Sequence, residues 1–208
     1  MTWKKVPKNN EDTVELLFPV PFYRSNVEIK KSELDFIKKQ KFTRNYNAFI
    51  GQTNVLACEE MKHVANIIEE KVKIFFYEVC GMSDIVKPEL VNSWINLHQR
   101  GDWAQLHKHY NSIITGVLYL DVDEKSGEFF VYPKGNLFGP QLNFEKEKDN
   151  ALNADAAGFT PKNGDLYLFP ATMEHNVSPN NSDIKRLSVA FNYMMRGIVK
   201  SEYRDVKI

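Results

Sequence analysis

The strand pattern near the C-terminal end of the chain constrains the fold most. In residues 186–194 (RLSVAFNYM), apolar and polar side chains alternate with a period of two. This is the pattern of a β-strand that turns one face to a core. The apolar face carries Leu187, Val189, Phe191 and Tyr193, and the other face carries Arg186, Ser188, Ala190 and Asn192. The apolar face predicts packing against a further layer of the protein, such as helices.

The polar face of this strand needs partners if it points into a cavity. A buried polar group without a hydrogen-bond partner costs about 1–3 kcal/mol. A small dicarboxylate would satisfy this face, because Arg186 can form a bidentate pair with one carboxylate and Ser188 can donate to the same group. The alternative is a surface strand with Arg186 in solvent, and the apolar opposite face argues against it.

Short strands separated by Gly, Pro, Asn and Asp fill the chain after about residue 88. The predicted strands are 91–98, 104–109, 113–121, 127–132, 164–169, 174–178 and 185–195. Many short strands with such turns are typical of an all-β barrel or jelly roll. A polar connection as long as 133–162 is uncommon unless it is a lid, a substrate loop or locally disordered.

Helices are predicted only before this β-rich region. Apolar residues recur at three- and four-residue steps over 54–80, and a short helix is predicted over 32–39. The apolar run 14–23 contains two prolines and predicts an edge strand or extended arm. The fold class is therefore α+β and mainly β, a jelly roll braced by N-terminal helices. We expect one domain, with residues 1–87 as arm and supporting helices and residues 88–208 as the jelly-roll core.

Charge and composition exclude several classes. Lys+Arg and Asp+Glu both number 27, so the net charge of zero disfavours a nucleic-acid partner. No window approaches the about 18 apolar residues of a membrane span, and the first residues carry no apolar signal segment. Cys58 and Cys80 are expected to be reduced thiols. We therefore expect a cytoplasmic protein without a membrane partner.

Residues 30–49 mix cations with aromatic side chains. Residues 1–50 hold ten Lys/Arg against six Asp/Glu, and Phe42, Tyr46 and Phe49 are interleaved with the cations. The segment either binds a polyanion or forms a solvated helix face and its exit loop.

Three histidines of the β-rich part form a candidate metal site. His107 and His109 are two apart in QLHKHYN, so in a strand both would face one metal. His175 follows the strand GDLYLFP and is the candidate third ligand. Three nitrogen ligands suit iron, zinc, copper or nickel. Tyr119 is a candidate second donor to a cavity ligand or a core tyrosine, and Asn96 shares a strand face with Trp94 and His98.

The segments 91–132 and 164–193 together resemble the iron(II)- and 2-oxoglutarate-dependent oxygenases. They are most similar to small bacterial and phage members of that superfamily, and more distantly to prolyl 4-hydroxylases. The resemblance rests on HKHYNSIITGVLYLDVDEKSGEFFVYP, followed by GDLYLFPATMEHNVSPNNSDIKRLSVAFNYM. It implies a double-stranded β-helix, and Fe(II), 2-oxoglutarate and O2 as cofactor and cosubstrates.

The resemblance also implies roles for individual residues. His107 and His175 match the two metal-binding histidines, and Arg186 with Ser188 matches the R-x-S pattern that pairs with the distal carboxylate of 2-oxoglutarate. Tyr119 matches a tyrosine on the same carboxylate, and we add Asn96 and Asn192 as cosubstrate-binding candidates. His109 departs from the family, which has Asp or Glu at this position. It is either a direct third ligand or a residue that lies next to the ligands without binding the metal.

The implied function is a dioxygenase that hydroxylates an unidentified substrate, a protein side chain or a small metabolite, with release of succinate and CO2. No acid or base separate from the iron site is assigned. Two alternatives are a cupin-like metal-dependent dioxygenase or isomerase that does not use 2-oxoglutarate, and a non-enzymatic jelly-roll binding module. The R-x-S strand argues against a simple cupin, which does not need it.

Overall fold

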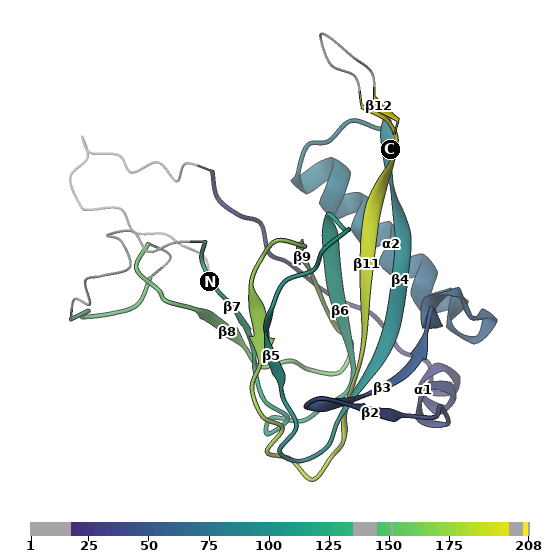
Figure 1. Ribbon diagram of the computed structural model, residues 1–208, viewed down its shortest axis with the longest axis vertical. Helices are drawn as coiled ribbons and strands as arrows, with labels where there is room; N and C mark the ends of the chain where they lie inside the picture. The colour runs from purple at the N-terminus through teal and green to yellow at the C-terminus, as the bar shows by residue number, and fades with distance from the viewer. Residues whose placement is uncertain (1–17, 135–144, 151, 200–205, 208) are drawn as a thin grey trace.

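Two antiparallel sheets form the frame of the protein (Figure 1). The structure is a computed structural model that describes residues 18–134, 145–150, 152–199 and 206–207. The strands of the large sheet are β1 (Tyr23–Asn26), β2 (Thr43–Asn45), β3 (Ala48–Thr53), β4 (Val86–His98), β6 (Ile114–Asp121), β9 (Asp165–Pro170), β11 (Arg186–Val199) and β12 (Val206–Lys207). The strands of the small sheet are β5 (Ala104–His107), β7 (Phe129–Val131), β8 (Ala157–Phe159) and β10 (His175–Val177).

The path of the chain between the sheets is that of a jelly roll. The large sheet has the order β1-β9-β6-β11-β4-β3-β2, with β12 beside β11, and the small sheet has the order β5-β10-β7-β8. From β4 to β11 the chain changes sheet at every connection except β7 to β8. Successive strands therefore supply opposite walls of the same interior. The predicted mainly β jelly roll is confirmed.

The predicted helix over 54–80 is α-helical only in its middle. The 3-10 turns η1 (Val55–Ala57) and η2 (Glu59–Met61) precede α2 (Lys62–Lys73), and the π-helix η3 (Ile74–Val79) follows it. Ser93 of β4 explains why the segment does not begin as an α-helix. Its hydroxyl accepts a hydrogen bond from the backbone N–H of Leu56, and its carbonyl accepts one from the backbone N–H of Asn54. These bonds to a strand far along the chain fix the first turns outside α geometry.

The short helix begins one residue before the predicted start. It is α1 (Lys31–Lys38), and Lys30 is the residue before its first turn. The backbone N–H of Lys30 donates to Glu33 Oε2 at 2.7 Å, so the Glu33 carboxylate closes the first turn. Ser32, the first residue of the predicted helix, lies inside that turn.

The two faces of the large sheet have different cores. The apolar face of β11 shares one buried cluster with Ile68 and Val72 of α2, and α2 runs along the back of that sheet (Figure 1). Fully burying such side chains is worth about 1.5–3 kcal/mol each. The other face meets the small sheet through an aromatic cluster that includes Phe129, Tyr167 and Phe169. The predicted direction of the apolar face of β11 is confirmed.

Several segments differ from the predicted strands. The β2–β3 hairpin was not predicted, and β8 lies within 133–162, where a loop was expected. Residues 135–144 and 151 lie outside the described residues, so the lid role of 133–162 stays a prediction. Residues 14–17 also lie outside them, and β1 is an edge strand that begins only at Tyr23.

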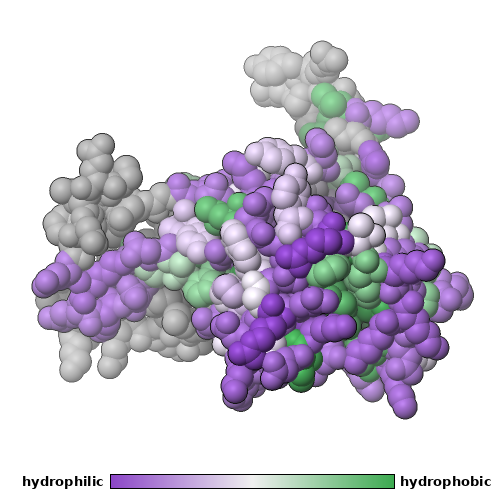
Figure 2. Space-filling model, turned by 60° about the horizontal axis from the view of Figure 1, so that its bottom comes forward, coloured by the Kyte–Doolittle hydropathy of each residue, from purple (hydrophilic) through white to green (hydrophobic). Residues whose placement is uncertain are grey.

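Other expectations concern the chain as a whole. Cys58 and Cys80 are free thiols. No helix among the described residues is long and apolar enough to cross a membrane. The one-domain division at residue 87 stays a prediction, although β1, β2 and β3 come from before that position and extend the large sheet. On the face that Figure 2 shows, hydrophilic side chains predominate and apolar ones form small separate patches.

Candidate active site

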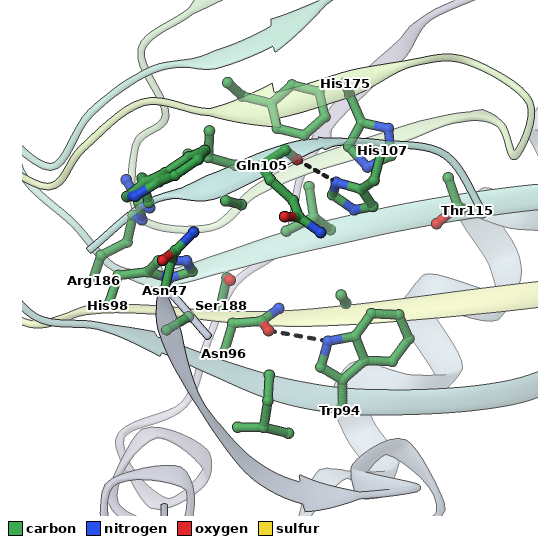
Figure 3. Close-up of a pocket in the computed structure, with 18 of the residues that line it drawn as sticks. Asn47, Trp94, Asn96, His98, Gln105, His107, Thr115, His175, Arg186 and Ser188 are labelled. Carbon is green, nitrogen blue, oxygen red and sulfur yellow. Dashed lines mark hydrogen bonds between the residues drawn. The ribbon is translucent and has the colours of Figure 1, made fainter. Parts of the chain in front are cut away.

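The three predicted metal ligands meet in a cavity between the two sheets. Figure 3 shows two of them, His107 and His175. His107 ends β5 and lies directly opposite His175, the first residue of β10. The ligand nitrogens of His107, His109 and His175 all lie within 4.8 Å of one another. β5 ends before His109, contrary to the predicted strand. The backbone N–H of His109 instead donates to the Ala171 carbonyl at 2.9 Å, which holds it beside the other two.

Hydrogen bonds fix the orientation of two of the rings. His107 Nδ1 lies 2.7 Å from the Gln105 carbonyl, and His175 Nδ1 lies 2.9 Å from the Met173 carbonyl. A carbonyl only accepts, so each Nδ1 carries the proton and each Nε2 keeps a free lone pair. The ring of His109 packs against that of Trp94, with centroids 5.9 Å apart.

Burial keeps two of the three imidazoles uncharged. Desolvation, with His107 nearby, lowers the pKa of His175 to about 3 and that of His109 to about 4. Both imidazoles are therefore neutral at pH 7, the form that binds a metal. The three converging imidazole nitrogens fit a first-row metal such as iron, and by donor chemistry alone they also fit zinc, copper or nickel.

A second polar group lies deeper in the cavity, around Arg186. This side chain is 1% exposed. Its Nη1 donates to the carbonyl of Ser126 and, at 3.1 Å, to that of Ser178. Its Nη2 and the hydroxyl of Tyr119 are buried and have no hydrogen-bond partner among the described residues. Burial raises the pKa of Tyr119, so its hydroxyl is a neutral donor.

These unpartnered donors indicate an anionic ligand. Buried polar groups in proteins are nearly always hydrogen-bonded, and a buried cation needs a counter-charge. The cavity has a volume of about 260 Å³, and Arg186, Tyr119 and the three histidines all line it. A small dicarboxylate fits this arrangement, because one end would meet Arg186 and Tyr119 while the other reaches the metal site.

The remaining predicted residues have different surroundings. Ser188 and Asn96 line the cavity. Asn96 Oδ1 accepts from Trp94 Nε1 at 3.0 Å, which leaves its amide NH2 group for a ligand. Asn192 lies on the same face of β11 but is not among the residues that line the cavity, and its amide donates to Asn92 Oδ1 at 2.9 Å.

Several cavity residues were not assigned a role from the sequence. His98 shares the strand face of Asn96, and that alternation was a usable signal. The tip of the β2–β3 hairpin (Asn45, Tyr46 and Asn47) and residues Trp103 and Gln105 also line the cavity. No local pattern placed them there, since the hairpin reaches this position through its pairing with β4.

A family comparison identifies the enzyme class. Residues 92–192 match the model of a family described as "Putative 2OG-Fe(II) oxygenase". The matched stretch contains the three histidines, Tyr119 and Arg186. No curated protein matches the sequence. The resemblance stated from the sequence is confirmed, and with it the enzyme class and its use of iron and 2-oxoglutarate.

Solved structures share the fold at low sequence identity. An oxidoreductase of the 2OG-Fe(II) oxygenase family from Burkholderia pseudomallei is 14% identical, with a TM-score of 0.56 over 77% of this chain and 75% of that chain. A prolyl-4-hydroxylase from Pseudomonas putida is 14% identical, with a TM-score of 0.56 over 86% and 94%. HygX from Streptomyces hygroscopicus, with nickel and 2-oxoglutarate bound, is 11% identical, with a TM-score of 0.56 over 84% and 83%. At these identities the likeness is one of fold.

Proposed function

We propose, from the place of residues 92–192 in the 2OG-Fe(II) oxygenase family, that this protein hydroxylates a C–H bond of an uncharged substrate group. One observation carries the proposal. The unpartnered donors of Arg186 and Tyr119 share a cavity with three converging histidine nitrogens. The chemistry that iron and 2-oxoglutarate supply when bound is oxidation of the substrate by O2, with succinate and CO2 as co-products.

His107, His109 and His175 would hold the metal in this proposal. The carbonyls of Gln105 and Met173 support the first and third, because they fix the tautomer that leaves Nε2 free. With three neutral ligands, the net charge of the metal site is one unit more positive than with two histidines and a carboxylate. An anionic cosubstrate would offset that charge.

Arg186, Tyr119 and Ser188 would hold the distal carboxylate of 2-oxoglutarate. The bonds from Arg186 Nη1 to two backbone carbonyls fix the guanidinium before any ligand arrives, so little side-chain entropy is lost on binding. Asn96 would donate its free amide hydrogens into the same cavity. Asn192 does not line the cavity, and it would support this binding site only indirectly, through its bond to Asn92.

Aromatic side chains would exclude water around the metal site. Phe129 and Phe169 are 2% and 1% exposed, and their ring centroids lie 5.4 and 4.9 Å from that of His175. A dry surrounding strengthens the electrostatic hold on the cosubstrate and shields the oxidising chemistry from side reactions.

The residues at the entrance of the cavity favour an uncharged substrate group. Arg186 is the only Asp, Glu, Lys or Arg among the described residues that line the cavity, and the proposal commits it to the cosubstrate. The entrance offers amides from Asn47 and Gln105 and exposed rings from Tyr46 and Trp103. Amides and rings bind neutral hydrogen-bonding groups, whereas a charged group would find no counter-charge there. A neutral protein side chain and a neutral small metabolite both satisfy this condition.

The test is succinate formation. Purified protein with Fe(II), ascorbate and 2-oxoglutarate is expected to release succinate slowly, and His175→Ala is the matched control that lacks a metal ligand. Neutral peptides and metabolites are then added singly beside charged analogues. Faster succinate release with a neutral compound, and a mass gain of one oxygen atom in it, supports the proposal. No succinate above the His175→Ala level refutes it.

Neither alternative accounts for the cavity as well. A cupin-like enzyme without 2-oxoglutarate leaves the buried donors of Arg186 and Tyr119 without a ligand. A non-enzymatic module has no need for three converging imidazoles.

A further inference from the structure

His98 is a buried histidine to which the proposed function gives no role. It is the last residue of β4 and lies directly opposite Arg186 in the β4–β11 pairing. The residue is 5% exposed and lines the cavity. Both ring nitrogens are buried and have no hydrogen-bond partner among the described residues. A histidine that is merely structural normally satisfies at least one nitrogen, so these atoms indicate a missing ligand.

The charge state of His98 follows from its neighbours. Burial, together with the positive charges of Arg186 and Arg44, lowers the pKa of His98 to about 3. The ring is therefore neutral at pH 7, with one N–H donor and one lone pair. A neutral ring can stay beside the Arg186 guanidinium, where an imidazolium would be repelled.

The position of His98 matches that of the other unpartnered donors. Figure 3 shows Arg186 and His98 together at one end of the cavity, with His107 and His175 away from them. Ser188 pairs with Asn96 on one side and Tyr119 on the other, in the next row of the sheet. His98 thus belongs to the wall around Arg186 and is not a fourth member of the metal site.

We propose that His98 is a cosubstrate-binding residue that donates a ring N–H to the distal carboxylate of 2-oxoglutarate, beside Arg186 and Tyr119. This inference rests on the proposed function, because it requires 2-oxoglutarate in the cavity. The carboxylate has about four lone-pair positions, enough for Arg186 Nη2, the Tyr119 hydroxyl and one His98 nitrogen. All the unpartnered donors at this end of the cavity then gain an acceptor.

The test compares two ligands that differ at the distal end. 2-Oxopentanoate has the same five-carbon chain as 2-oxoglutarate, with a methyl group in place of the distal carboxylate. Binding of each to the Ni(II)-loaded protein is measured by calorimetry. His98→Leu is expected to weaken 2-oxoglutarate binding about ten- to a hundredfold, the worth of one hydrogen bond to a charged group. Binding of 2-oxopentanoate should not change, and His98→Gln should restore part of the 2-oxoglutarate affinity.

A second measurement uses the unaltered protein. In the Zn(II)-loaded protein, the ring N–H resonance of His98 should move downfield on addition of 2-oxoglutarate and stay in place with 2-oxopentanoate. If His98→Leu binds 2-oxoglutarate normally, or weakens both ligands equally, the inference is overturned while the proposed function stands. If the wild-type protein binds no 2-oxoglutarate, both are overturned.

Discussion

Gly127 makes room for the side chain that our account assigns to 2-oxoglutarate. Its φ of +87° lies in the left-handed region, and a Cβ there would lie 2.8 Å from Arg186 Nη1. The same Cβ would lie 2.6 and 2.8 Å from the carbonyl oxygens of Ser178 and Pro179. Gly127→Ala therefore strains the backbone and pushes the guanidinium away from its place.

The expected magnitudes follow from these contacts. A left-handed alanine costs about 1–2 kcal/mol, and relief of the close contacts brings the loss of stability to about 2–4 kcal/mol. Displacing Arg186 removes a hydrogen bond to a charged group, which weakens 2-oxoglutarate binding about ten- to a hundredfold.

Two other glycines provide matched controls. Gly197 has φ +141° at the far end of β11, and its Cβ would lie 2.6 Å from the Ile85 carbonyl. Gly101 has φ +85° with nothing within 4 Å of an added Cβ. Gly197→Ala should lose comparable stability and Gly101→Ala only about 1–2 kcal/mol. Both should bind 2-oxoglutarate as the wild-type protein does.

The assay combines urea denaturation with calorimetric titration of 2-oxoglutarate into the Ni(II)-loaded variants. The reasoning is refuted if Gly127→Ala loses stability as Gly197→Ala does and yet keeps the wild-type affinity.

Three further predictions concern the metal site, acid stability and the hairpin. His175→Ala should abolish stoichiometric iron binding in metal analysis, whereas His109→Asp should retain it; equal loss in both variants would contradict the assigned ligand roles. The pKa of His98 is about 3 in the folded protein and about 6.5 in an unfolded chain, so the unfolded state binds more protons between these values and stability falls as pH drops below 6.5. Between pH 7 and pH 5, the free energy of unfolding of His98→Leu should therefore fall by up to about 2 kcal/mol less than that of the wild-type protein, as measured by urea titration. The same pH dependence in both proteins would exclude a buried neutral ring at position 98. Arg44→Ala should lower the stability by about 1–2 kcal/mol, because its partner Asp102 is only 8% exposed. Arg100→Ala removes a pair whose side chains are 67% and 93% exposed, so it should lower the stability by only about 0–0.5 kcal/mol. Equal losses of stability in thermal unfolding would refute that distinction.

The alternation in β11 was predictable because it is local. A strand with a period of two shows both of its faces in the sequence, so the apolar face of β11 and the cavity face of Arg186 and Ser188 followed from residues 186–194. The grouping of the three histidines was predictable for a similar reason, since a close histidine pair and a third histidine after a strand limit the ways in which they can meet.

The features that could not be predicted from the sequence depend on contacts between distant segments. The 3-10 start of the helical region arises from bonds to Ser93, which no helical periodicity reveals. The role of His98 depends on its register opposite Arg186 and on the burial of both ring nitrogens. The hairpin at the cavity entrance is placed by its pairing with β4. Registers between strands are set by the whole packed sheet.

The central claim is that one cavity holds a metal on three histidines and 2-oxoglutarate against Arg186. Anaerobic titration with Fe(II), followed by 2-oxoglutarate, tests it directly by visible absorption. The account predicts one Fe(II) per chain and a weak metal-to-ligand band that grows to saturation at one equivalent of 2-oxoglutarate, with neither event in His175→Ala. Iron binding without a 2-oxoglutarate-dependent band, or a band of equal size in His175→Ala, would contradict it.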